Sequence, residues 1–159
     1  MGIVVRALQE NDCQCESHFV QSKILVLDDD LNILSAFEKF FDQERLTMIA
    51  TTTPEDAMKA LQKQVIDVLI TDVRLNWKSG VTFFLNAKAA YPQLPVIVIT
   101  GYHESISEQE LQAMGVDHFL LKPLDLEKLR TAVHDCLRKR KPPTNSKSSQ
   151  PRFHREGNV

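Results

Sequence analysis

Short runs of consecutive apolar residues recur along the middle of the chain, and longer stretches with helical periodicity separate them. Because the runs are apolar at nearly every position rather than at alternate positions, they predict strands that are buried on both faces of a sheet. The intervals are too long for hairpins, so we expect the strands to lie parallel. The five expected strands cover residues 24–27, 46–50, 65–70, 96–99 and 119–121.

Within the intervals, apolar residues stand three or four positions apart, as on a helix with one buried face. The second helix is expected to begin at Thr53, a capping residue followed by Pro54 and an acidic first turn. The fourth, over residues 104–114, has the fewest apolar positions and is the weakest element. The residues that indicate the buried faces are Leu31, Ile33, Leu34, Phe37, Phe40 and Phe41 in the first helix, Val81, Phe84, Leu85 and the stem of Lys88 in the third, Ile106, Leu111 and Met114 in the fourth, and Leu126, Leu129, Val133, Cys136 and Leu137 in the fifth.

Strands that alternate with helices in this way predict an α/β fold, a doubly wound five-stranded parallel sheet of the (βα)5 type. A chain of 159 residues has the size of one ordinary domain, which we place at residues 23–139. Residues 1–22 are polar apart from a short apolar run at residues 3–5. Residues 140–159 are rich in Pro, Ser and charge, so both ends are expected to be flexible extensions.

The net charge of −2 is unevenly distributed, because residues 138–159 hold seven Lys or Arg against one Glu and the rest of the chain carries about −8. Basic tails of this kind are more often solvated than bound to nucleic acid, so we do not expect direct nucleic-acid binding. No apolar run is long enough to span a bilayer and the N-terminus lacks a secretory signal, which favours the cytoplasm. The three cysteines have no zinc-like spacing and are expected to be reduced thiols.

Polar residues follow four of the five expected strands. Asp28 and Asp29 come directly after the first strand, and Asp72 follows the third. Thr100 follows the fourth strand and Lys122 the fifth. Because the carboxyl ends of parallel strands meet at one edge of the sheet, where ligands bind in this class of fold, these side chains are expected to share one crevice. Any one of them alone has an ordinary structural explanation, whereas their convergence indicates a functional site.

Three carboxylates in one crevice repel one another, and burial raises their pKa values unless positive charge compensates. A hard divalent cation, Mg²⁺ or Mn²⁺, meets this need because it prefers oxygen ligands and leaves positions for phosphate. Lys122 adds a further positive charge, and Thr100 adds a hydroxyl donor. A carboxylate in such a setting can attack phosphorus to form an acyl phosphate. Asp30, in contrast, is expected to cap the first helix.

These residues resemble the receiver domain of bacterial two-component response regulators, the family that includes the single-domain chemotaxis regulator. The resemblance covers residues 23–139 and rests on the segments ILVLDDD, DVLITDVRL, VIVITGY and DHFLLKPLD, with Gly80 eight residues after Asp72. It implies a flavodoxin-like sheet with strand order 2-1-3-4-5. It also implies that Asp72 is the phosphoacceptor in a phosphorelay, receiving its phosphoryl group from a sensor histidine kinase or a histidine phosphotransfer protein. The chain would then not be an enzyme, beyond assisting its own phosphoryl transfer and slow self-dephosphorylation.

The resemblance assigns further roles to residues at the strand ends. Lys122 would pair with the phosphoryl group, while Thr100 and Phe119 would move together as the switch. Arg74 and Tyr102 would modulate the lifetime of the acyl phosphate, with no sign predicted. The implied metal ligands are Asp28, through water, Asp29, Asp72 and the backbone carbonyl of Arg74.

Two positions depart from the family pattern. Phe119 lacks the hydroxyl of the commoner tyrosine, and Asn76 replaces the usual proline before Trp77, so we expect a more mobile loop and a partner contact at Trp77. No output domain is predicted after the fifth helix. The expected output is therefore a surface change on the fourth helix, fifth strand and fifth helix, read by a downstream protein. A phosphorylation-dependent homodimer is left open.

Two other functions are considered. A haloacid-dehalogenase-like phosphatase also uses an Asp after its first strand, a strand-end Thr and a lysine, but Asn32 stands where its pattern has Thr or Val. Asp72 would also have no role in that enzyme. A receiver-like docking module that is never phosphorylated usually lacks the acceptor, an acid or the lysine, and all are present here. The phosphoacceptor hypothesis is therefore preferred.

Overall fold

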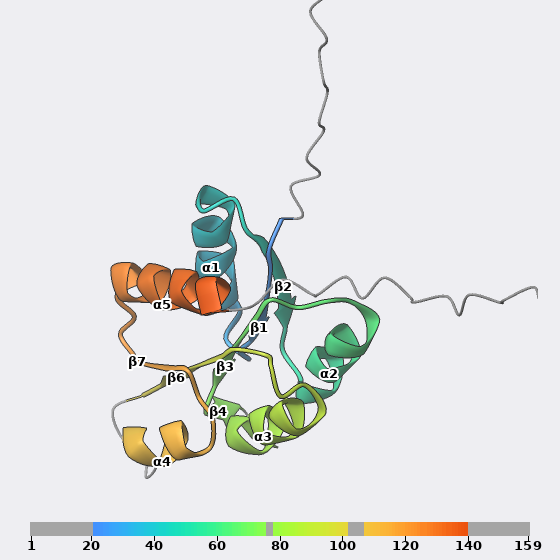
Figure 1. The fold of residues 1–159 in the computed structure, drawn as a ribbon. Coiled ribbons are helices and arrows are strands. Elements are labelled where there is room, and N and C mark those ends of the chain that lie inside the picture. The colour runs from blue at the N-terminus through green and yellow to red at the C-terminus, as the bar shows by residue number, and fades with distance from the viewer. Residues whose placement is uncertain (1–20, 76–77, 102–106, 140–159) are drawn as a thin grey trace, which may run out of the picture.

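A five-stranded parallel sheet forms the middle layer of the computed structural model, which describes residues 21–75, 78–101 and 107–139 (Figure 1). The strands pair in the order β2-β1-β3-β6-β7, which is 2-1-3-4-5 when they are counted along the chain. The predicted α/β fold and strand order are therefore confirmed. The strands are β1 (Lys23–Leu27), β2 (Thr47–Thr51), β3 (Val68–Asp72), β6 (Val96–Thr100) and β7 (His118–Leu121).

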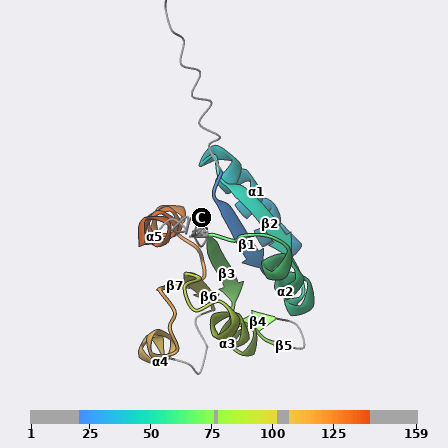
Figure 2. The same cartoon turned by 45° about the vertical axis from the view of Figure 1, so that its right-hand side comes forward.

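Helices cover both faces of this sheet, as Figures 1 and 2 show from two directions. The helices on one face are α1 (Leu31–Gln43) and α5 (Leu126–Lys139), and those on the other are α2 (Pro54–Lys63), α3 (Gly80–Ala90) and α4 (Glu108–Ala113). The chain passes from β1 to β2 on one side and then returns to β3 on the other side of β1. The strand order thus reverses between β1 and β3, the point at which doubly wound folds bind ligands. None of the described helices is long and apolar enough to cross a membrane.

The central strands are buried as their sequences predict. All five residues of β3 and all five of β6 are buried. β3 begins at Val68 rather than at Val65, because Val65 lies in the connection before the strand with 66% of its surface exposed. β2 is an edge strand, and its residues are only partly buried or exposed. The apolar runs therefore located the strands. The exact ends of each strand depend on where the chain enters and leaves the sheet.

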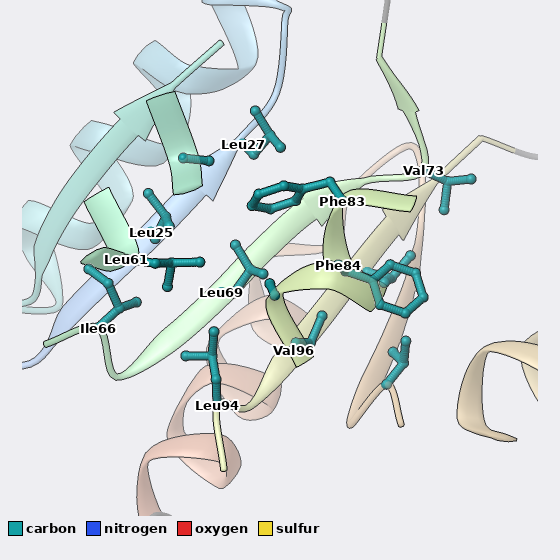
Figure 3. Packing of buried hydrophobic residues seen from close by; sticks show 14 of the residues in the cluster. Leu25, Leu27, Leu61, Ile66, Leu69, Val73, Phe83, Phe84, Leu94 and Val96 are labelled. Atoms are coloured by element: carbon teal, nitrogen blue, oxygen red, sulfur yellow. The ribbon is translucent and has the colours of Figure 1, made fainter. Parts of the chain in front are cut away.

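Two hydrophobic clusters lie on opposite faces of the sheet. Figure 3 shows the cluster under α2 and α3, in which Leu69 of β3 packs with Phe83 and Phe84 of α3. The other cluster lies under α1 and α5, where the Phe41 ring meets those of Phe37 and Phe40 edge to face, with centroids 5.9 and 5.2 Å away. Near the end of α5, Cys136 is fully buried in this second cluster, and Leu137 packs against it. The core thus extends almost to the last described residue.

The predicted helix starts are confirmed where a capping residue marks them. The side chain of Asp30 accepts a hydrogen bond from the backbone of Asn32 and caps α1. Thr53 caps α2, with Pro54 in its first turn. α4 begins later than the predicted residue 104, because Ser107 forms a capping box with Glu110 and fixes the start at Glu108.

Some predicted apolar faces are wrong in detail. α3 buries Phe83, Phe84 and Ala87, whereas Leu85 is exposed. The first residues of α1 and α5, Leu31 and Leu126, are also exposed, because both precede the buried turns of their helices. Helical spacing identified the helices, but each helix has more apolar residues than its buried face holds. The packing decides which of them are covered.

A short antiparallel pair, β4 (Arg74–Leu75) and β5 (Lys78–Ser79), was not predicted from the sequence. Each strand has two residues, too few for a periodicity to appear. The pair connects β3 to α3. Asn76 and Trp77, the positions expected to form a mobile loop, lie outside the described residues, as do Tyr102 and Ile106. Almost all of the two predicted extensions, 1–22 and 140–159, also falls outside them, so their flexibility stays a prediction.

Candidate functional site

The polar residues singled out from the sequence lie along one edge of the sheet. β1, β3, β6 and β7 are neighbours in parallel register, so their carboxyl ends point the same way. Asp28 follows β1, Asp72 ends β3, Thr100 ends β6 and Lys122 follows β7. The edge lies at the point where the strand order reverses. The structure thus brings together residues that are up to 94 positions apart in the sequence.

Lys122 joins two buried carboxylates at the centre of this edge. Its Nζ forms an ion pair with Oδ2 of Asp72 and lies 3.4 Å from Oδ2 of Asp28. Asp28 and Asp72 are only 2% and 6% exposed. Carboxylates this deeply buried need a compensating charge. Lys122, itself partly buried, supplies it.

The pKa values of this group reflect both burial and charge. Burial raises the pKa of Asp28 above its ordinary value, even though a backbone hydrogen bond from Asp30 and the charge of Lys122 act in the opposite direction. Burial would lower the pKa of Lys122, but its hydrogen bond to Asp72 and the charge of Asp28 outweigh that effect and the pKa is raised. Lys122 is therefore a fixed positive charge at neutral pH.

The backbone holds each carboxylate in place through its other oxygen. Oδ1 of Asp28 accepts a hydrogen bond from the Asp30 amide at 2.8 Å. Oδ1 of Asp72 accepts one from the Arg74 amide at 2.9 Å. In both cases the donor is two residues further along the chain, the turn geometry that Asp commonly forms with its own backbone. The two acids are thus oriented before any ligand binds.

Gly80 allows the start of α3 to approach the back of Asp72. A Cβ atom at Gly80 would lie 1.8 Å from the carbonyl oxygen of Asp72, closer than any real contact. The Gly80 amide donates to the carbonyl oxygen of Val73 at 2.9 Å and fixes the approach. The sequence shows Gly80 only as a glycine eight residues after Asp72. Its role depends on a tertiary contact, which no local pattern shows.

Thr100 and Phe119, the expected switch residues, occupy neighbouring strands. Thr100 is 1% exposed, and its hydroxyl donates to the carbonyl of Gly101 at 3.3 Å, a long hydrogen bond. Its own carbonyl accepts the Lys122 amide at 2.8 Å. Phe119 is half-buried and borders a pocket of about 330 Å³ that Lys122 and Pro123 also line. The backbone of Thr100 thus contacts Lys122 of the site, whereas its hydroxyl is hydrogen-bonded to Gly101.

The donor atoms fit a hard cation in their chemistry. Asp28 and Asp72 offer oxygen ligands beside an existing positive charge, and oxygen ligands are those that Mg²⁺ prefers. Within the described ranges, however, no three His, Cys, Asp or Glu side chains are grouped as a metal site would require. Asp29 is half-buried and Arg74 is exposed. The predicted ligand set of Asp28, Asp29, Asp72 and the Arg74 carbonyl thus stays a prediction.

The sequence of the chain has recognisable relatives. A protein-family model described as response regulator receiver domain matches residues 24–134. The response regulator protein PilR of Pseudomonas aeruginosa is 30% identical over 122 residues, which are 77% of this chain and 27% of PilR. The transcriptional regulatory protein GlrR of Escherichia coli is 25% identical over 124 residues, which are 78% of this chain and 28% of GlrR. The chain thus spans less than a third of the length of these two relatives.

Solved structures show the same architecture. A response regulator receiver protein from Pseudomonas putida has 28% identity and a TM-score of 0.67, over 72% of this chain and 97% of that one. The chemotaxis response regulator CheY4 of Vibrio cholerae has 24% identity and a TM-score of 0.66, over 74% of this chain and 99% of that one. The latter likeness shows the fold alone. The family match over residues 24–134, with the sheet edge described above, establishes that this chain belongs to the response regulator receiver domains of two-component signalling.

Proposed function

We propose that the chain is a phosphorylation-dependent switch in which Asp72 accepts a phosphoryl group from a histidine of a sensor kinase or a phosphotransfer protein. The observation that carries the proposal is the placement of Lys122, whose ammonium group pairs with Asp72 and lies 3.4 Å from Asp28. Lysine in this position neutralises negative charge where a phosphoryl group would add more. Family membership supports this function over the phosphatase considered above.

The transfer is a nucleophilic substitution at phosphorus. A carboxylate oxygen of Asp72 forms a bond to phosphorus while the bond from phosphorus to the donor imidazole nitrogen breaks. The nitrogen keeps the electron pair and later takes a proton from water. Lys122 stabilises the negative charge that gathers on the phosphoryl oxygens, and the Arg74 amide, 2.9 Å from Oδ1, holds the carboxylate in place. The Thr100 hydroxyl needs to give up only a long hydrogen bond to meet the new oxygens.

We further propose that Asp28, Asp29, Asp72 and the carbonyl of Arg74 hold a divalent cation, Mg²⁺ or Mn²⁺, during this reaction. Bound there, the cation supplies positive charge to the phosphoryl oxygens. The buried pair of Asp28 and Asp72 supports this role, because two carboxylates share a single lysine. Removal of divalent cations by a chelator is expected to stop acceptance of the phosphoryl group.

The proposed output is a change in the surface formed by α4, β7 and α5, read by another protein. Within the described chain, α4 has six residues and buries only Leu111, so few contacts hold it. Leu121 of β7 and Leu126 of α5 are large apolar residues that are exposed. Elements with few buried contacts are those that shift most readily between conformations. A partner protein or a second copy would select the phosphorylated form.

The experiment is incubation of the protein with acetyl phosphate and Mg²⁺, followed by intact-protein mass spectrometry. The wild-type protein is expected to gain one labile phosphoryl group, and Asp72→Asn is expected to gain none. Asp30→Asn is the matched control, because asparagine caps a helix about as well as aspartate and the site keeps its other acids. A wild-type protein that never gains the group would contradict the proposal and favour the docking module instead.

A further inference from the structure

A second pocket lies at the opposite edge of the sheet from Asp72. It has a volume of about 620 Å³ and lies between the ends of α2 and α3 and the starts of β3 and β6. Buried Leu61, Ile66 and Leu94 contribute to its lining, and Figure 3 shows them near the starts of those strands. The volume falls within the range of about 300–1,000 Å³ that is typical of ligand pockets. Several aliphatic side chains would fit in it.

The rim of this pocket exposes apolar side chains among polar ones. Val65 lines it and is 66% exposed, although Val is normally covered in a core. Ala90 and Pro92, which are also exposed, line it as well. Its polar lining residues are Lys63 and three glutamines, Gln62, Gln64 and Gln93. The apolar side chains of the pocket therefore favour an apolar occupant.

The N-terminal part of the chain meets the domain at this rim. The amide of Lys23, the first residue of β1, donates to Asp67 Oδ2 at 2.8 Å, and its carbonyl accepts the Asp67 amide at 2.8 Å. The Lys23 ammonium donates to Oε1 of Gln64 at 3.0 Å, and Gln64 lines the pocket. Whatever precedes Lys23 thus leaves the described structure beside the pocket. α5, which ends at Lys139, packs on the other face of the sheet.

The sequence before Lys23 contains one apolar run that suits the pocket. Residues 3–5 read Ile-Val-Val, and the residues that connect this run to Lys23 are mostly polar. We propose that the apolar run of residues 3–5 docks in the pocket of its own chain. Residues 6–22 are long enough for this, because seventeen residues reach up to about 56 Å when extended. Residues 140–159 contain no comparable run of aliphatic residues.

The short connection makes even a weak contact effective. A flexible connection of this length gives an effective concentration in the millimolar range, so a contact with a dissociation constant of about 1 mM would be occupied about half of the time. The pocket-lining loops should then exchange their amide hydrogens about twofold more slowly than they would without the segment. Removing the apolar side chains of residues 3–5 should abolish that protection while leaving the core unchanged.

The test is hydrogen–deuterium exchange of the full chain, read at the pocket segments 61–66 and 90–94. One variant is the triple substitution Ile3→Asn, Val4→Asn, Val5→Asn in the docking segment. The other is Val65→Asp in the pocket, for which exchange is read at 90–94 only because residue 65 lies within the segment 61–66. Both are expected to exchange about twofold faster there than the wild-type protein. Asn11→Ser, in the connection, is the control and should match the wild type. Exchange in α5 reports that each variant is folded.

Equal exchange in the wild-type protein and the triple variant would overturn the proposal. So would a difference that disappears on tenfold dilution, because the segment would then dock on a second copy rather than on its own chain. A difference that is independent of protein concentration and that Val65→Asp reproduces would support it.

Discussion

Gly80→Ala tests whether the close packing behind Asp72 is obligatory. A Cβ at Gly80 would lie 1.8 Å from the carbonyl oxygen of Asp72 and 2.9 Å from its carbonyl carbon. Both are backbone atoms, which cannot rotate away as the end of a side chain can. The hydrogen bond from the Gly80 amide to Val73 also ties the helix start to the strand end. Alanine can therefore be accommodated only by moving the segment that carries Asp72.

Two effects of opposite sign set the magnitude. Gly80 is the first residue of α3, and alanine in a helix is favoured over glycine by about 0.5–1 kcal/mol. Extra atoms forced into a packed region typically cost about 1–3 kcal/mol, and an overlap of this size belongs at the upper end. We expect Gly80→Ala to lower the free energy of unfolding by about 2 kcal/mol, or the Tm by on the order of 8 °C. Phosphoryl acceptance should fall as well, because Asp72 is displaced.

Urea unfolding at neutral pH measures the effect. Gly101→Ala is the matched control, since Gly101 lies at the same sheet edge but a Cβ there would meet nothing within 4 Å. Its free energy of unfolding should stay within about 0.5 kcal/mol of the wild-type value. If Gly80→Ala proves as stable as Gly101→Ala, helix propensity outweighs the contact and the reasoning about the back of the site is wrong.

Three further outcomes are expected. Phe41→Ala should lower the free energy of unfolding by about 3–5 kcal/mol in the same urea assay, because its ring is fully buried between two others, while exposed Glu38→Ala should change it little. Burial raises the pKa of the Cys136 thiol from 9.0 to about 12, and since the unfolded thiol ionises first, stability should fall as the pH rises above about 9. Urea titrations at about pH 8 and 10 should show a loss on the order of 1 kcal/mol from this group that Cys136→Ala lacks, and an identical loss in both proteins would argue against it. Ser107→Ala removes the capping box of α4 and should cost about 1 kcal/mol locally, seen as faster amide exchange at residues 108–113, whereas unchanged exchange would mean that the cap does not hold the helix.

The sequence alone identifies the fold and the candidate residues of the site. β3 and β6 are buried on both faces, so their sequences are apolar at consecutive positions. This pattern is typical of the interior strands of a parallel sheet. Asp72, Thr100 and Lys122 are visible because each interrupts apolar sequence at a strand end. Parallel strands place such residues at one edge whatever their separation along the chain. The same sequence reasoning therefore gives both the fold and the residues that meet.

Details set by tertiary contacts could not be read from the sequence. Four of the five residues that follow Gly80 are apolar or aromatic, and the helix buries Phe83 and Phe84 while exposing Leu85. The buried face is the one that packs on the strands in the hydrophobic cluster, and this packing is a tertiary contact. The pairing of Lys122 with both Asp28 and Asp72 is likewise a matter of side-chain reach. Sequence order predicts that such groups meet, but not which oxygen each contacts.

The packing of Cys136 and Leu137 against the core affects how this domain can be cut or fused. The family match ends at residue 134, but both residues pack in the cluster under α1 and α5. A fragment that stopped at the matched boundary would also lose Asp135, whose carboxylate lies 2.8 Å from the His118 ring of β7. Transplanting the receiver onto another protein therefore calls for a junction at or beyond Lys139, where α5 ends. A junction placed by homology alone would open the hydrophobic core to water at its last helical turn.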